Sequence, residues 1–198
     1  MPAVLHEPMP THTPLAHPAD GLTALLAECH DRIRSFTALA VSLAQASAPD
    51  PREVTATAQR LRRYFEEGFA QHALDEELSI LPRLAGRDGD VDAALVAMHR
   101  EHEHQRLAVE RLVALCAALA ADPARHPELA QPLGTAASAL QGHLAGHLER
   151  EETVIFPALG QVPAALRSDI AAEIRGRRSP GAAVRTAAHG ADQLGRAR

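Results

Sequence analysis

Two segments of this sequence repeat the same order of histidine, glutamate and proline. HALDEELSILP covers residues 72–82 and HLEREETVIFP covers residues 147–157; each reads His, three residues, Glu-Glu, four residues, Pro. A glutamate four residues after a histidine lies on the same helix face, about 6 Å further along the axis. The imidazole and the carboxylate of each pair can therefore reach one small volume. The pairs are His72 with Glu76 and His147 with Glu151.

These side chains are the ligand types of a metal site. A buried carboxylate without a partner is costly and becomes protonated instead, whereas a cation between carboxylates and imidazoles makes their burial tolerable. A carboxylate can also span two cations about 3.5–4 Å apart. Imidazole with carboxylate suits iron, manganese or zinc rather than a metal that prefers thiolate. The order and spacing differ from the ferritin-like Glu-x-x-His and from the zincin His-Glu-x-x-His motifs. The repeat thus predicts a dinuclear site.

Long segments with helical periodicity position these residues, and clusters of Pro, Asp and Gly separate them. The ranges are roughly 20–46, 51–82, 90–121 and 128–158, with a shorter helix at about 163–176. No segment shows the alternation of a strand, so we expect an all-α protein. Short connections between long helices predict an up-down-up-down four-helix bundle followed by a short fifth C-terminal helix. Pro82 and Pro157 are expected to end the second and fourth helices.

Each long helix carries polar residues in its inward apolar stripe. In the third helix the stripe passes from Met98 to His102, although His99 offers a competing phase. In the first helix it contains His30, with Cys29 competing for the inward position. At about 1.5 Å per residue, the four histidines fall within about 6 Å of one depth. The sequence predicts one layer of four imidazoles and two carboxylates, formed by His30, His72, Glu76, His102, His147 and Glu151.

Composition narrows the class of protein. The net charge of −5 argues against a nucleic-acid partner. No apolar run approaches the ~18 residues of a membrane span, and the start lacks a signal-peptide pattern, so we expect a cytoplasmic protein. Cys29 and Cys116 should differ in depth by roughly 22 Å and cannot form a disulfide. We expect a bundle over residues 21–176 between a disordered Pro/His-rich tail (1–20) and a disordered basic tail (177–198).

An ordered set of motifs resembles the hemerythrin-like family of HHE cation-binding proteins. The motifs are HDRIR at 30–34, HALDEELSILP, MHREHEHQRL at 98–107 and HLEREETVIFP. The similarity covers about residues 21–178, including RGRR at its end, and the ordered set is specific although each motif alone is weak. It implies a four-helix bundle with a non-haem di-iron centre. The cofactor would be two iron ions joined by an oxo bridge (Fe–O–Fe) or by carboxylates, with manganese or zinc as alternatives.

The resemblance also implies a ligand assignment. It gives His30 and His72 to one iron, His102 and His147 to the other, and Glu76 and Glu151 to both as bridges. Oxygen-carrying members have a further histidine one turn before the third-helix ligand, where this chain has Met98. His99 and His143 are expected to lie beside the ligands or to replace that histidine. Glu77 and Glu152 are expected in solvent or hydrogen-bonded to ligands.

The missing histidine favours an open metal position. We therefore expect a protein that binds or reacts with a small oxidant (dioxygen, peroxide or nitric oxide), with a role in oxidative stress. Turnover as a peroxide- or nitric-oxide-reactive oxidoreductase and simple oxygen or iron binding both stay open. The alternatives are iron donation for iron–sulfur cluster repair, and a metal- or redox-sensing regulatory bundle whose tails contact a protein partner. No nucleic-acid or membrane partner is expected.

Overall fold

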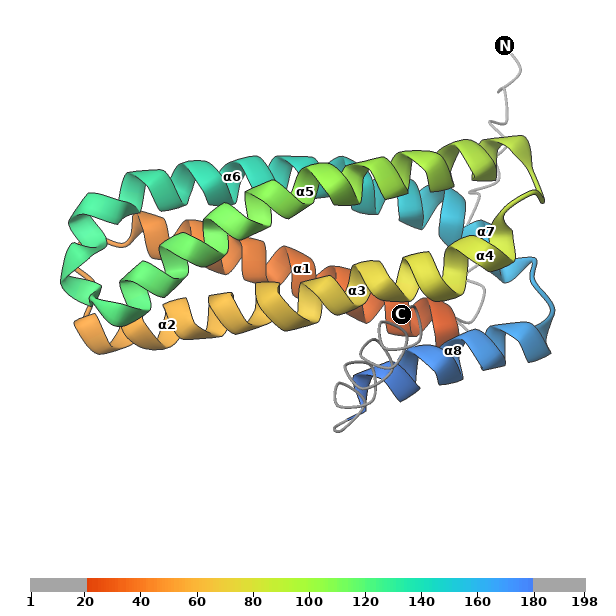
Figure 1. Ribbon diagram of the computed structural model, residues 1–198, viewed down its shortest axis with the longest axis horizontal. Coiled ribbons are helices and arrows are strands. Elements are labelled where there is room, and N and C mark those ends of the chain that lie inside the picture. Colours follow the sequence, from red (N-terminus) through yellow and green to blue (C-terminus); the bar gives the residue numbers. More distant parts are fainter. Residues whose placement is uncertain (1–20, 180–198) are drawn as a thin grey trace, which may run out of the picture.

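Four long antiparallel helical rods form the protein in the computed structural model, which describes residues 21–179 and confirms the expected all-α up-down-up-down bundle (Figure 1). The first rod is α1 (Gly21–Gln45) and the third is α5 (Gly89–Ala121). The second rod comprises α2 (Pro51–Arg63), η1 (Tyr64–Phe69), α3 (Ala70–Asp75), η2 (Glu76–Ile80) and α4 (Leu81–Leu84). The fourth comprises α6 (His126–Arg150), η4 (Glu151–Ile155) and α7 (Phe156–Gly160). The predicted tails at 1–20 and 180–198 lie outside the described residues.

Aspartates in the short connections start two of the rods. The Asp50 carboxylate accepts a hydrogen bond from the backbone N–H of Arg52 at 2.7 Å and caps α2, where Pro51 occupies the first turn. Asp88 caps α5 in the same way, accepting from the N–H groups of Asp90 and Val91 at 2.9 and 3.2 Å. These caps satisfy backbone donors that have no partner within the helix, and so fix where the rods begin.

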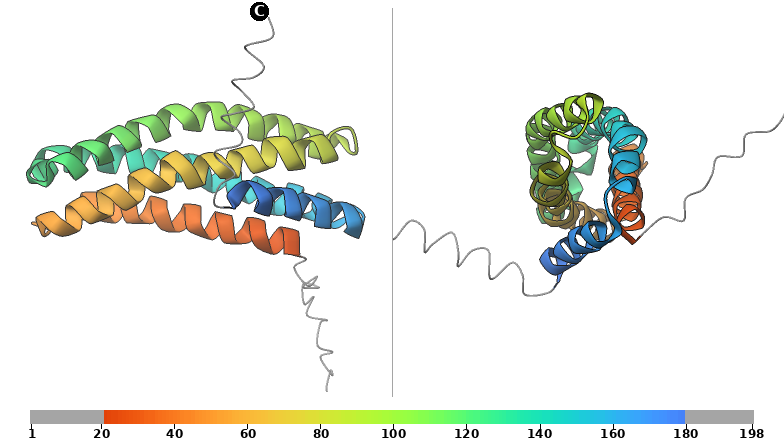
Figure 2. Two further views of the ribbon diagram at one scale, coloured as in Figure 1. Left: turned by 60° about the horizontal axis from the view of Figure 1, so that its bottom comes forward. Right: turned by 90° about the vertical axis from the view of Figure 1, so that its right-hand side faces the viewer.

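Two hydrophobic clusters fill the interior, and a layer of polar residues separates them. One cluster contains Ile33 and Leu144; the other contains Leu26 and Ile155. The buried histidines His30, His72 and His147 lie between a member of one cluster and a member of the other, as His30 does between Leu26 and Ile33. The end-on view in Figure 2 shows the four rods arranged around a common centre, and these residues are buried between the rods. The layer is therefore enclosed by apolar packing above and below.

The repeated motif coincides with π-helix in both rods that carry it. Within η2, the N–H of Leu81 bonds to the carbonyl of Glu76, five residues earlier. Within η4, the N–H of Phe156 bonds to the carbonyl of Glu151 in the same way. A single widened turn of this kind is frequent at functional sites. The duplication in sequence is thus also a duplication in backbone geometry.

The prolines after these turns do not end the helices. Proline has no N–H, and its ring crowds the carbonyl four residues earlier; the wider π-turn accommodates both effects. The carbonyl of Leu78, which Pro82 leaves without its usual donor, accepts a hydrogen bond from Arg83 Nη1 at 3.0 Å. The second and fourth rods consequently continue to Leu84 and Gly160. The prediction that Pro82 and Pro157 terminate them is wrong.

A fifth helix, α8 (Ala164–Arg178), lies outside the four rods beside α1 (Figures 1 and 2). It continues two residues beyond the predicted boundary at 176. Arg177 Nε lies 2.8 Å from Oδ1 of Asp75, and Arg178 Nη2 lies 2.6 Å from Oδ2 of the same carboxylate. Asp75 is fully buried, and a buried carboxylate requires such partners. The two arginines therefore belong to the folded bundle and not to the tail.

Both cysteines are buried and free, which confirms that no disulfide joins them. Cys116 lies in the cluster around Ile33, and burial raises the pKa of its thiol to about 12 from 9.0. In the unfolded chain the thiol ionises near pH 9, so this stabilising contribution is complete below pH 9 and is lost as pH rises. The free energy of unfolding should fall by up to about 1.4 kcal/mol per pH unit above 9 on this account. Cys116→Ala should remove that part of the fall in urea titrations from pH 7 to 11; slopes equal to those of the unaltered protein would contradict it.

Candidate metal centre

The structure brings all six predicted ligands together in the polar layer. They form two overlapping groups of four residues, in each of which the donor atoms lie within 4.8 Å of one another. The first group is His30, His72, Glu76 and Glu151; the second is Glu76, His102, His147 and Glu151. The two groups share both glutamates. They take one histidine from each rod, as the comparison of depths predicts.

Glu151 presents one carboxylate oxygen to each group. Its Oε2 lies 3.1 Å from His30 Nε2, and its Oε1 lies 3.0 Å from His147 Nε2. The side chain is 2% exposed, so both oxygens face the interior of the bundle. A carboxylate placed in this way can span two cations.

Glu76 does the same from the opposite rod. Its Oε1 lies 3.2 Å from His72 Nε2 and its Oε2 lies 3.1 Å from His102 Nε2. The two glutamates therefore face each other across the layer, each between one histidine of the first group and one of the second. Both are first residues of their π-turns, which links the unusual backbone to the placement of the carboxylates.

Most of these inward atoms lack any hydrogen-bond partner among the described residues. They include the Nε2 atoms of all four histidines, Oε2 of Glu76 and both carboxylate oxygens of Glu151. Buried polar atoms without partners are rare because each costs free energy of folding. Two cations, one in each group, would bind every one of these atoms. The donor set therefore fits a pair of imidazole- and carboxylate-binding metal ions.

Burial sets the protonation of the layer. It lowers the pKa of His72 to about 3, although Glu151 opposes the shift. It also lowers the pKa of His102, although the hydrogen bond that this ring donates to Glu77 opposes the shift. Burial and the charge of Glu151 raise the pKa of Glu76 well above its usual range. Burial likewise opposes ionisation of Glu151, but the neighbouring His30 and the other surrounding imidazoles outweigh it and lower the pKa of Glu151 to about 2. His72 and His102 are therefore neutral at pH 7, the form that binds metal.

The outer nitrogen of three of the four histidines is held by a carboxylate. A ring whose Nδ1–H donates in this way keeps its lone pair on Nε2, pointing at the layer. The pairs are His30 with Glu152 at 2.7 Å, His102 with Glu77 at 3.0 Å and His147 with Glu101 at 2.9 Å.

The doubled glutamate of each repeat is thereby explained. The first residue of the pair faces the layer, while the second, Glu77 or Glu152, orients a histidine of another rod. The expectation of a hydrogen-bonding role for these two residues agrees with this geometry. Glu101 was not anticipated, because its target His147 lies on a different rod and no local spacing relates them. Glu101 also pairs with Arg150 of the repeat at 2.5 Å. The positive charge of Arg150 was the signal in the repeat for a nearby carboxylate.

The other histidines considered for the site lie outside both groups. His99 is largely exposed, and its Nδ1 lies 3.4 Å from Glu77 Oε1, beside the acceptor of His102. His143 is exposed on α6 and belongs to neither group, which corrects its prediction as a neighbour or extra ligand. Leu144 takes the inward position at that turn as part of a hydrophobic cluster. Met98 is buried in the other cluster.

Gln105 is a polar residue of this region that the motifs did not indicate. It follows His102 by three residues and so lies on the same face of α5, within one turn. The residue is 2% exposed, and neither its amide nitrogen nor its amide oxygen has a hydrogen-bond partner in the described chain. Its position in an otherwise apolar stripe was the available signal. A buried, unpaired amide next to the layer can hydrogen-bond a ligand that enters it.

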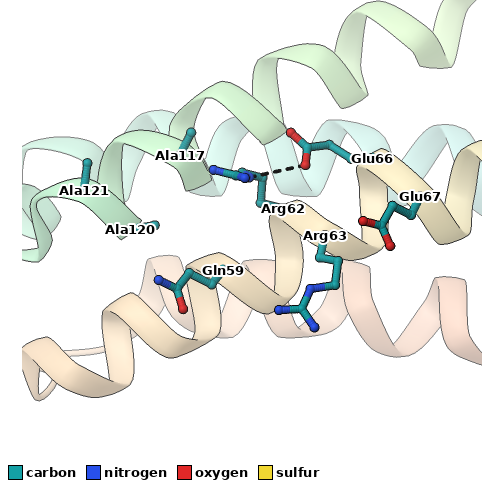
Figure 3. Close-up of a pocket in the computed structure, with 8 residues that line it drawn as sticks. All are labelled: Gln59, Arg62, Arg63, Glu66, Glu67, Ala117, Ala120 and Ala121. Atoms are coloured by element: carbon teal, nitrogen blue, oxygen red, sulfur yellow. Dashed lines mark hydrogen bonds and ion pairs between the residues drawn. The ribbon is translucent and has the colours of Figure 1, made fainter.

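A surface hollow of about 520 Å³ between η1, the end of α2 and α5 contains none of the six ligands (Figure 3). Its walls are charged side chains, among which Arg62 pairs with Glu66 at 3.3 Å, and Ala117, Ala120 and Ala121 form the α5 side. These mixed charges and small apolar groups include no cluster of metal-binding donors. The candidate metal-binding donors of residues 21–179 lie in the buried layer instead.

Comparison with known families agrees with this geometry. The model of the hemerythrin HHE cation-binding domain matches residues 21–159. The chain belongs to this hemerythrin family. No curated protein sequence matches it. The matched range contains both repeats and the four rods except the last residue of the fourth, Gly160, whereas α8 follows it. Both groups of donors lie within the part of the chain that matches this cation-binding domain.

Glu101 offers a test of the outer hydrogen bonds in this hemerythrin domain. Glu101→Gln removes the charge that orients His147, so the group containing His147 should bind metal roughly 10- to 100-fold more weakly. The His30 and His72 group should change little. Zinc titration against a chromophoric chelator measures both. Glu103→Gln, an exposed change on the same helix, is the matched control. Equal weakening of the two groups, or none, would contradict the role given to Glu101.

Proposed function

We propose that this hemerythrin domain is a non-haem di-iron protein that binds or reacts with a small oxidant, namely dioxygen, peroxide or nitric oxide. The observation that supports two ions is the placement of each glutamate, with one oxygen toward each group. Each group offers four protein donors, which leaves room for an exogenous ligand. Met98, in place of a further histidine, leaves that room on the third rod.

The iron ions would supply redox and Lewis-acid chemistry at the layer. The chain orients His30, His102 and His147 through their outer carboxylates, and so presents lone pairs on Nε2 without rearrangement. The hydrophobic clusters on both sides limit access of bulk water. The Gln105 amide is available to donate a hydrogen bond to a small ligand that enters beside His102.

Rapid mixing of the reduced, iron-loaded protein with each oxidant tests this proposal. Optical spectra should change with at least one of dioxygen, peroxide and nitric oxide, and no change with any of them would contradict it. Gln105→Leu should weaken binding of the reactive ligand about 3- to 10-fold, the effect of one lost hydrogen bond. The same change should stabilise the metal-free protein by about 1–3 kcal/mol, because it removes a buried amide without partners.

Other aspects of the function stay predictions. We further propose iron, rather than manganese or zinc, as the metal and a role in oxidative stress. Enzymatic turnover, iron donation and a regulatory sensor with partners at the tails are the other functions that the sequence predicts. The same holds for a cytoplasmic location and for the expected lack of nucleic-acid and membrane partners. Among residues 21–179, no helix combines the length and the apolarity that crossing a bilayer requires.

A further inference from the structure

His72 differs from the other three histidines of the layer. The Nε2 atom of His72 points into the layer toward Glu76, like the Nε2 atoms of the other three histidines. Its Nδ1 atom, however, has no hydrogen-bond partner in the described chain. The residue is 2% exposed. Since Nε2 must carry the lone pair for a metal, Nδ1 bears the hydrogen and is a donor. Three histidines donate this hydrogen to a carboxylate of the protein, and the fourth has no carboxylate of the protein to receive it.

A pocket of about 420 Å³ lies against His72. α1 contributes Cys29 and Arg32, the second rod contributes Tyr64 and Gln71 beside His72, and the end of α8 contributes Arg177 and Arg178. The pocket is therefore formed where the fifth helix covers the bundle at the level of the metal layer. Its size exceeds that of a few water molecules and falls within the range of small-ligand sites.

The pocket wall carries more positive than negative charge. Arg177 and Arg178 share the single buried carboxylate of Asp75. Arg32 makes no ion pair within the described residues, and its nearest polar partner is the Cys29 thiol at 3.6 Å. Glu67 is the acidic residue of the lining. The local excess of positive charge contrasts with the net charge of −5 of the whole chain.

We propose that this pocket binds a small carboxylate anion, which accepts a hydrogen bond from His72 Nδ1 and pairs with the guanidinium group of Arg32. The inference rests on the proposed metal site, because His72 presents Nδ1–H outward when Nε2 binds a metal ion. The bound carboxylate completes the set formed by Glu77, Glu101 and Glu152 on the other histidines. Binding of the anion and binding of metal then strengthen each other by the same factor.

The pocket also holds a phenol that can contact such an anion. Tyr64 stacks on Phe36, with ring centroids 3.8 Å apart, and is the only tyrosine of the chain. A Cβ at Gly68 would lie 3.1 Å from the Tyr64 ring, so glycine at this position lets the ring lie against the helix. The hydroxyl group can donate a second hydrogen bond to the carboxylate. A carboxylate is the expected anion because carboxylates accept the hydrogen bond of the other three histidines.

Zinc affinity of the full-length protein, measured by chelator competition, tests the proposal. Millimolar acetate or succinate should raise the zinc affinity of the unaltered protein roughly 10-fold over chloride at equal ionic strength. Arg32→Gln should abolish this gain and Tyr64→Phe should reduce it. Arg60→Gln, which removes an exposed arginine elsewhere on the second rod, should retain it.

A gain that persists in Arg32→Gln would mean that carboxylate binds the metal directly, and would overturn the assignment of the pocket. A gain with phosphate but with neither carboxylate would overturn the ligand class. Zinc binding without added anion reports on the metal site alone, so its loss would contradict the proposed function instead. In that case the pocket is judged by NMR of ¹³C-labelled succinate with metal-free protein, where Arg32→Gln should abolish binding; equal binding by that variant would overturn the pocket.

Discussion

Glu151→Gln should deprive the protein of both metal ions, whereas His72→Ala should deprive it of one. Each oxygen of Glu151 belongs to a different group of donors, so loss of the carboxylate charge weakens both positions at once. His72 belongs to the first group alone. Metal content per chain after reconstitution and gel filtration, determined by mass spectrometry, should fall from two to nearly zero for Glu151→Gln. It should fall to about one for His72→Ala.

Glu149→Gln is the matched control, since this exposed residue lies two positions before Glu151 and belongs to neither group. It should retain two ions. Glu76→Gln should behave as Glu151→Gln does, because Glu76 occupies the equivalent position in the other repeat. A protein that keeps one ion after either glutamate change would show that the carboxylate does not bridge.

Removal of the metal should lower the melting temperature of the protein by roughly 10 °C. A ligand at a thousand times its Kd stabilises the folded state by about 4 kcal/mol, which corresponds to a shift of this size in a chain of this length. The physical cause is the set of buried donors that have no other partner. Thermal unfolding of chelator-treated and metal-loaded protein, followed by circular dichroism, provides the measurement.

The double change His72→Leu and Glu76→Leu supplies the control. It replaces a polar pair of the layer by apolar groups, which removes one histidine and one of the two shared carboxylates of the metal site. Its melting temperature should not respond to chelator. If metal-free and metal-loaded forms of the unaltered protein melt together, the buried donors are stabilised by something other than a cation.

Sequence periodicity was sufficient to predict the helical bundle and to predict that the six candidate ligands lie close together. Apolar residues at steps of three and four locate the inward face of each rod, and a histidine on that face is visible as an interruption. Counting residues from the connections then places His30, His72, His102 and His147 at one depth, because the rise of a helix is constant. The structure agrees, with ring centroids of His30 and His72 5.3 Å apart and of His102 and His147 5.1 Å apart.

Interactions between rods could not be predicted in this way. Glu101 on α5 contacts His147 on the adjacent α6, and the choice of that carboxylate over its neighbours depends on side-chain conformations that periodicity does not encode. Pro82 was wrongly predicted to end its helix, because the expected effect of proline applies to a regular α-helix. The π-turn before Pro82 lets the helix continue. The two arginines at the end of α8 resembled a tail until their buried partner Asp75 was seen.

The division of the apolar interior has a consequence for folding cooperativity. With its buried donors unsatisfied, the layer is a weak junction between two half-cores, so either end of the metal-free bundle can open as a sub-global unit of its own. Ions held by residues from all four rods couple these units, and unfolding of either end then requires release of the ions. The metal pair would thus make a long, thin bundle behave as one cooperative domain.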